Sequence, residues 1–212
     1  MITLENVSIV AGEFRLDGVS FAVPKGGYAV LMGRTGRGKT TILEAICGLR
    51  RVASGGVLID DVNVTDWLPG DRQIGYVPQD LALFPTLSVK QHLAFALRLR
   101  DWPKARMEAR VGELSGVLGI EHLLDRGVEA LSGGESQRVA LGRAISFHPS
   151  VLLLDEPLSA LDESTRAEMH ELLKRIQETT GVTTLHVTHS EEEAEALADH
   201  RFVLEDGDVR MI

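Results

Sequence analysis

Residues 28–49 have the sequence YAVLMGRTGRGKTTILEAICGL, and this stretch decides the fold. It begins with a short apolar run, continues through a glycine-rich loop and ends in apolar residues at helical spacing. The loop at residues 33–40 fits the pattern G-x-x-x-x-G-K-[ST], which places backbone N–H groups and a helix N-terminus around phosphate groups. We therefore predict a strand, a phosphate-binding loop and a helix, in that order.

The residue types of this loop suit the binding of a nucleoside triphosphate. Glycine lets the backbone turn tightly, so that its N–H groups can face an anion. Lys39 supplies a positive charge for the β and γ phosphates, and the hydroxyl of Thr40 can bind Mg²⁺. A glycine-rich turn without a ligand would have a similar composition, but the flanking strand and helix favour a binding site. The predicted nucleotide-binding residues are Gly33, Arg34, Thr35, Gly36, Arg37, Gly38, Lys39, Thr40 and Thr41.

Two features of the loop leave alternatives open. The motif alone does not separate a kinase, a GTPase and a motor protein. Arg34 and Arg37 are unusual in such a loop, and we expect both side chains to point into solvent. A second hypothesis is that Arg37 raises nucleotide affinity through its positive field.

Composition and charge narrow the class of protein. The chain has 212 residues, 44% of them hydrophobic, which is enough for one folded domain. Its net charge of -9 argues against a nucleic-acid partner, and we expect none. Cys47 is the only cysteine, so neither an internal disulfide nor a multi-cysteine zinc site is available. Because no apolar run is long enough for a bilayer and no signal peptide is recognisable, we expect a soluble protein.

Strands and helices alternate on both sides of a central helical block. The expected strands are residues 2–10, 14–23, 28–33, 57–61, 73–79, 151–157 and 183–189. The expected helices are residues 40–49, several within 88–147, then 163–178 and 191–200. Breaks in the central block are expected near Pro103 and Gly127. This order predicts an α/β core with an inserted helical subdomain.

A second candidate site element is the acidic end of the apolar segment VLLLDEP, residues 151–157. Ligands gather at the carboxyl ends of strands in a parallel sheet. Asp155 is placed to hold Mg²⁺, and Glu156 to act as the general base for an attacking water. Two adjacent acids could also form an ordinary turn, but phosphoryl transfer needs both an anion cradle and a metal anchor.

Residues 131–138, LSGGESQR, contain the start of a helix. Ser132 is a suitable N-cap, and the helix start can bind an anion. This segment also resembles the signature motif of the ATP-binding cassette (ABC) family. Further matches are Gln79 in YVPQD with the Q-loop, Asp162 in SALD with the D-loop, and His189 in HVTHS with the switch histidine. The resemblance covers nearly the whole chain.

The resemblance implies the architecture. It implies a phosphate-loop NTPase core of the RecA-like type, with an N-terminal antiparallel β subdomain and an inserted α-helical subdomain. Residues 1–212 are expected to form a single nucleotide-binding domain. Residues 1–86 and 146–212 would form the catalytic core with its β subdomain, and residues 87–145 the helical subdomain that carries the signature motif.

The resemblance also implies an ATPase mechanism with ATP and Mg²⁺ as cofactors. A homodimer, or a pair with a related subunit, would sandwich two ATP molecules between the phosphate loop of one chain and the signature motif of the other. The implied catalytic residues are Lys39, Gln79, Glu156 and His189, and the implied magnesium-binding residues are Thr40, Gln79 and Asp155. Ser132, Gly133, Gly134 and Glu135 would contact the ATP of the partner, and Asp162 would communicate between the two sites.

Adenine recognition is where the sequence departs from the family. Members usually stack adenine on an aromatic residue near the end of the first strand, and this position falls near Val10. Phe14 is the nearest aromatic residue, and we predict that it takes the stacking role. A core position for Phe14 is the alternative.

Residues 68–95 resemble the Q-loop region of importer ATPases for molybdate, tungstate and sulfate, and of related spermidine or sugar systems. We therefore expect a transport ATPase on the cytoplasmic face of the cell (inner) membrane. Its expected partners are integral membrane permease subunits that dock near residues 79–87, and a solute-binding protein is a further candidate. The alternative is a non-transport ABC ATPase with a regulatory or nucleic-acid-associated role. Because the sequence stops soon after Val209, we expect no C-terminal regulatory extension.

Overall fold

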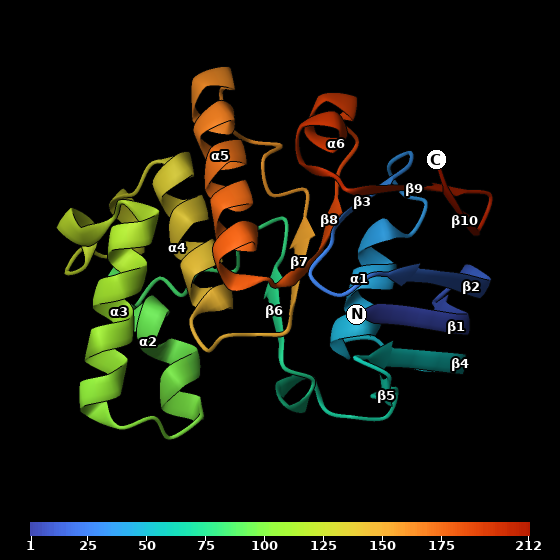
Figure 1. The fold of residues 1–212 in the computed structure, drawn as a ribbon, viewed down its shortest axis with the longest axis horizontal. Coiled ribbons are helices and arrows are strands. Elements are labelled where there is room, and N and C mark those ends of the chain that lie inside the picture. Colours follow the sequence, from blue (N-terminus) through green and yellow to red (C-terminus); the bar gives the residue numbers. More distant parts are fainter.

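The computed structural model describes residues 1–212 as two sheets and six α-helices (Figure 1). The strands are β1 Ile2–Ala11, β2 Phe14–Val23, β3 Tyr28–Met32, β4 Val52–Ile59, β5 Val62–Asn63, β6 Ile74–Val77, β7 Val151–Asp155, β8 Thr183–Val187, β9 His200–Glu205 and β10 Asp208–Met211. The α-helices are α1 Lys39–Cys47, α2 Val89–Leu99, α3 Lys104–Leu118, α4 Gly133–Ile145, α5 Glu163–Thr180 and α6 Glu191–Leu197. Three short 3₁₀ turns are η1 Pro69–Asp71, η2 Glu121–Leu123 and η3 Val128–Ala130.

An antiparallel sheet with the strand order β2-β1-β4-β5 begins the chain. Leu16, Val19 and Phe21 on β2 are buried while the residues between them are exposed, as expected for a sheet with one face on the core. A tight turn joins β1 to β2 and pairs Ala11 with Phe14. The sheet thus brings Phe14 to one corner, beside the phosphate-binding loop.

The second sheet has the order β10-β9-β3-β8-β7-β6. Its strands β3, β6, β7, β8 and β9 pair in parallel, and only β10 is antiparallel to its neighbour. β7 and β8 are buried along their whole length, because helices or the other sheet cover both faces. The loops after β3, β7 and β8 therefore meet at one edge of the sheet.

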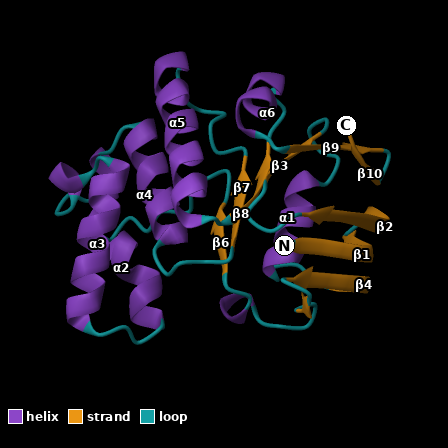
Figure 2. Cartoon of the chain, viewed as in Figure 1, coloured by secondary structure: helices purple, strands orange, loops and turns teal.

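Alternation along the parallel strands divides the apolar interior into two clusters. Val30 and Leu154 face a cluster that also contains residues of α2, α3, α4 and α5. Leu31 and Leu153 face the other cluster, which joins α1 to the antiparallel sheet. As a result α1 lies between the two sheets, and the longer helices cover the opposite face (Figure 2).

The helical block packs around α4. Gly142 is its point of closest approach, because a side chain there would collide with Leu93 of α2 and Leu118 of α3. The larger apolar cluster includes residues of this block and of the parallel sheet, so the boundary at residues 87–145 stays a prediction. None of the helices combines the length and apolar character needed to span a bilayer.

Three details of the predicted elements are wrong. The strand expected over residues 57–61 begins five residues earlier, because β4 runs from Val52 to Ile59. The last helix was expected over residues 191–200, but α6 ends at Leu197 and His200 starts β9. The hairpin of β9 and β10 was not predicted. Asp206 and Gly207 both have positive φ, of 47° and 87°, which is the turn geometry that an Asp-Gly pair favours.

Arg72 holds the far end of α1. Its guanidinium donates hydrogen bonds to the carbonyls of Ala45 and Ile46 at 2.9 and 2.8 Å, near the C-terminus of that helix. It also donates to the carbonyls of Thr65 and Trp67. Burial lowers the pKa of Arg72, but a guanidinium remains charged and satisfies carbonyls that the helix leaves free.

Candidate ATP-binding site

The loop between β3 and α1 forms an anion cradle from its backbone. Gly33, Gly36 and Gly38 have φ values of 147°, 78° and 101°, which residues with side chains rarely adopt. The N–H groups of Lys39 and Thr40 have no hydrogen-bond acceptor within the protein, because they lie in the first turn of α1. These free donors at a helix N-terminus fit phosphate oxygens.

Lys39 lies beneath this loop. Only 5% of its surface is exposed, and its Nζ donates to the carbonyls of Gly33 at 2.7 Å and Arg34 at 3.2 Å. The same ammonium group that would face phosphate therefore also shapes the loop. A charge held in this way interacts more strongly with a phosphate than one in open solvent does.

Asp155 and Thr40 supply a candidate magnesium site. Asp155 ends β7, is 2% exposed, and its Oδ1 has no hydrogen-bond partner. Burial raises the pKa of Asp155, and a hydrogen bond with Thr40 partly opposes that rise. An orphaned carboxylate oxygen beside a hydroxyl fits Mg²⁺, which accepts few protein ligands and completes its shell with water and phosphate oxygens. Nowhere does the chain gather three or more His, Cys, Asp or Glu residues that could hold a metal by themselves.

Glu156 and His189 face each other at the same edge. Glu156 has a φ of 46°, and its N–H donates to the carbonyl of Val187 at 2.9 Å, which fixes it to the end of β8. Its Oε2 lies 3.4 Å from Nδ1 of His189. The Glu156 side chain is 15% exposed and that of His189 is 58% exposed, so both can reach a ligand.

One cleft of about 300 Å³ brings together most of the predicted phosphate-loop residues, with Gln79 and Glu156. It is lined by Ala11, Phe14, Thr35, Gly36, Gly38, Lys39, Thr40, Thr41, Gln79 and Glu156. Phe14 lies so close to the loop that a side chain at Gly38 would collide with its ring. Phe14 thus lies beside the phosphate-binding loop, as stacking on adenine would require, but the stacking role itself remains a prediction. Ala11 lines the cleft, whereas Val10 does not. Ala11 was not predicted from the sequence, although neighbouring residues of a strand point to opposite faces of its sheet, so that only one of the two can face the cleft.

The signature and D-loop residues do not line this cleft. Ser132 and Glu135 form a reciprocal cap at the start of α4, with hydrogen bonds of 2.7 and 3.3 Å. Asp162 caps α5 by accepting from the N–H of Thr165 at 3.0 Å, which lowers the pKa of its carboxyl. Ser132, Gly133 and Asp162 are exposed, so a second molecule can reach them.

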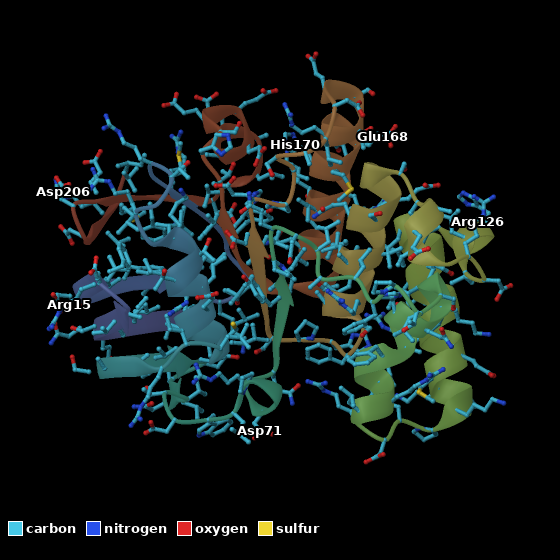
Figure 3. The ribbon with its side chains drawn as sticks, turned by 180° about the vertical axis from the view of Figure 1, so that it is seen from behind. Arg15, Asp71, Arg126, Glu168, His170 and Asp206 are labelled. Atoms are coloured by element: carbon cyan, nitrogen blue, oxygen red, sulfur yellow. The ribbon has the colours of Figure 1, made fainter.

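Arg37 differs from the expectation that it is only solvated. Its guanidinium lies 3.4 Å from Asp206 in the turn between β9 and β10, which Figure 3 places at the rim of the molecule. The pair is exposed, so its contribution to stability is small. Arg34 is exposed as expected and lines a neighbouring cleft of about 590 Å³ together with His189.

Known proteins resemble the chain in sequence over most of its length. A family model described as "ABC transporter" matches residues 16–159. The chain belongs to the ABC transporter family. The ABC resemblance drawn from the motifs is thereby confirmed, as is the predicted fold class.

Curated relatives of this ABC domain are import ATP-binding proteins. WtpC of Thermococcus kodakarensis, described as a molybdate/tungstate import ATP-binding protein, is 44% identical over 207 residues, which are 98% of this chain and 63% of that protein. MalK of Photorhabdus laumondii, described as a maltose/maltodextrin import ATP-binding protein, is 42% identical over all of this chain and 58% of its own length. The chain thus spans less than two thirds of the length of these relatives.

Solved structures also match this ABC domain. A structure described as the dimeric structure of MJ0796, a bacterial ABC transporter cassette, has a TM-score of 0.89 and 30% identity, and covers 100% of this chain and 98% of its own. A second, described as a post-hydrolysis state of the same cassette bound to ADP and Pi, has a TM-score of 0.88.

Proposed function

We propose that this ABC domain binds and hydrolyses ATP as the motor of a transporter. The observation that carries the proposal is the single cleft that joins the phosphate-binding loop to Gln79 and Glu156, with His189 placed 3.4 Å from Glu156. An anion cradle, a metal anchor and a base thus lie at one sheet edge, as phosphoryl transfer requires.

Each residue has a distinct task in this proposal. The loop N–H groups and Lys39 hold the β and γ phosphates of ATP. Thr40 and Asp155, with Gln79, would hold Mg²⁺, which would neutralise phosphate charge when bound. Glu156 accepts a proton from the attacking water, and His189 orients both the water and the γ-phosphate.

The exposed signature motif supports a composite site. Ser132 and the N–H groups at the start of α4 form an anion-binding helix N-terminus that the chain's own cleft does not use. In a head-to-tail homodimer, or a pair with a related subunit, this helix start would close over the ATP of the partner. A two-fold axis would generate two such sites.

Mixing inactive variants tests this composite site. Lys39→Ala and Ser132→Arg homodimers are each expected to lose ATP hydrolysis, but their mixture forms dimers with one intact site and recovers about a quarter of the wild-type rate. The matched control is a mixture of Lys39→Ala with Glu156→Gln, which both damage the loop side of the site and restore none. Phosphate release measures all three. Equal rates in the two mixtures would contradict a shared site.

We further propose that the motor drives import by integral membrane permease subunits on the cytoplasmic face of the cell (inner) membrane. The curated relatives support import, but their described substrates differ, which leaves an oxyanion as one candidate beside sugars and glycerol phosphate. The exposed segment at residues 79–87 is the proposed docking place for the permease, and a solute-binding protein would deliver the substrate.

Purification from detergent-solubilised membranes tests the membrane partner. The tagged chain is expected to retain an integral membrane subunit, and Phe84→Glu, which places a charge on the exposed docking segment, is expected to release it. Leu68→Glu, at an exposed apolar residue outside that segment, is the matched control. Recovery of nucleic acid in place of a membrane subunit would favour a non-transport role instead.

A further inference from the structure

A cluster of buried polar side chains lies under the loop that carries His189, and the proposed mechanism does not use it. The exposed fraction is 2% for Tyr28 on β3, 0% for His186 on β8 and 4% for Glu193 on α6. Burying ionisable groups costs free energy unless they bond to one another. The contacts of these side chains with one another and with the backbone therefore indicate which part of the structure they stabilise.

The contacts run in a chain through the imidazole of His186. The Tyr28 hydroxyl lies 3.0 Å from its Nδ1, and Glu193 Oε2 lies 3.3 Å from its Nε2. Burial raises the pKa of Tyr28 well above its ordinary value, so its hydroxyl stays protonated. Burial acts to raise the pKa of Glu193, but the polar groups of His186 and Thr188 beside it outweigh burial and lower that pKa. Because the protonated Tyr28 hydroxyl donates to Nδ1, the neutral imidazole carries its proton on Nε2, which faces Glu193 Oε2 at 3.3 Å without forming an aligned hydrogen bond.

The same cluster is bonded to the backbone on both sides of His189. Before it, the hydroxyl of Thr188 accepts from the N–H of Ser190 at 3.1 Å and lies near enough to Glu193 to lower the pKa of that carboxyl. After it, the hydroxyl of Ser190 accepts from the N–H of Glu193 at 3.2 Å. His189 is thus the one residue between two that are tied to Glu193, and its own side chain remains free to face Glu156.

We propose that Glu193 and His186 are positioning residues that hold the His189 loop against Glu156, and that Tyr28 orients His186 for this role. Neither Tyr28, His186 nor Glu193 lines the nucleotide cleft, so their effect runs through His189. The proposal deepens the proposed function and rests on it for its kinetic readout.

His170 of α5 completes the surroundings of the cluster. It lies where α5 faces α6 in Figure 3, and its Nε2 is buried without a hydrogen-bond partner. Burial lowers the pKa of His170, so its ring stays neutral and does not compensate the negative charge of Glu193. Glu193 therefore faces His186 of β8 with its carboxylate and bonds to Ser190 of the His189 loop with its N–H, which links α6 to that strand.

The kinetic test separates turnover from binding. Glu193→Gln is expected to lower kcat about tenfold and to change KM for ATP less than about twofold, since the phosphate-binding loop is untouched. Tyr28→Phe removes one hydroxyl, keeps the packing, and is expected to lower kcat about threefold; it carries the test if Glu193→Gln fails to fold. Glu192→Gln, an exposed neighbour on α6, is the matched control and keeps the wild-type kcat.

A double variant identifies the route of the effect. In a His189→Ala background, followed by single-turnover hydrolysis of labelled ATP, Glu193→Gln is expected to add no further loss. An equal fold loss in both backgrounds would show that Glu193 acts on stability in general, and would overturn the proposal.

A nucleotide-free measurement keeps this proposal separate from the ATPase proposal. In ¹⁵N spectra of the histidine rings, His186 is expected to carry its proton on Nε2, and the His189 signals are expected to shift in Glu193→Gln but not in Glu192→Gln. If the wild-type chain hydrolyses no ATP while these shifts occur, the positioning role stands and the proposed function fails. Unshifted His189 signals would overturn the positioning role.

Discussion

Replacing Glu156 with glutamine is expected to lower kcat for ATP hydrolysis by at least about a hundredfold, the lower end of what a general base contributes. Glutamine fills the same space beside His189, but it cannot accept the proton of the attacking water. ATP affinity should remain, because Lys39 and the loop N–H groups are unchanged. Steady-state phosphate release and ATP titration measure the two effects.

The same variant should also accumulate a dimer. If ATP closes the composite site and hydrolysis reopens it, Glu156→Gln with ATP sediments as a dimer, whereas the wild type returns to monomer as ATP is consumed. Glu171→Gln, an exposed acid on α5, is the control and behaves as wild type. An unchanged kcat in Glu156→Gln would remove the general-base role.

Replacing Lys39 with alanine is expected to weaken ATP binding by at least about a hundredfold, because a charge in a partly desolvated site is worth several kcal/mol to a phosphate. The change also deprives the carbonyls of Gly33 and Arg34 of their donor. Leaving such groups unsatisfied costs about 1–3 kcal/mol each, so the loop itself should loosen.

Isothermal titration with ATP and thermal unfolding separate these two contributions. Lys39→Arg keeps a charge but not the shape of the ammonium, and should recover less than a tenth of the lost affinity if the loop geometry matters. Lys174→Ala, on an exposed part of α5, is the matched control. Full ATP affinity in Lys39→Ala would mean that the loop binds phosphate through its backbone alone.

The elements that the sequence predicted best are those that a short local pattern specifies. The loop at residues 33–40, the buried strand ending in Asp155 and the cap at Ser132 all depend on local spacing, which one stretch of sequence carries by itself. The cleft then follows from a topological rule, since the carboxyl ends of parallel strands meet at one edge.

The parts that the sequence did not predict depend on contacts between distant segments. Arg37 and Asp206 are 169 positions apart, and Tyr28 and His186 are 158 apart, so no local pattern links them. The hairpin of β9 and β10 is different, because its Asp206-Gly207 turn was visible in the sequence but no strand was predicted on either side of it. The exposed signature residues do not line the nucleotide cleft of their own chain, so a test of their role requires a second molecule.

Arg72 fixes the C-terminal end of α1, so this helix can transmit a displacement along its length. Its N-terminal end carries the phosphate-binding loop, and its C-terminal end is fastened by one guanidinium to Thr65 and Trp67. A hydrogen-bonded helix of this length is a stiff rod of about 13 Å. A hydrogen bond from Arg100, the residue that follows α2, to the carbonyl of Gly70 continues the connection to the helical block. A displacement of the phosphate-binding loop would therefore be transmitted along α1 to Arg72 and the segment at residues 65–72. From there the hydrogen bond of Arg100 would carry it to the helical block.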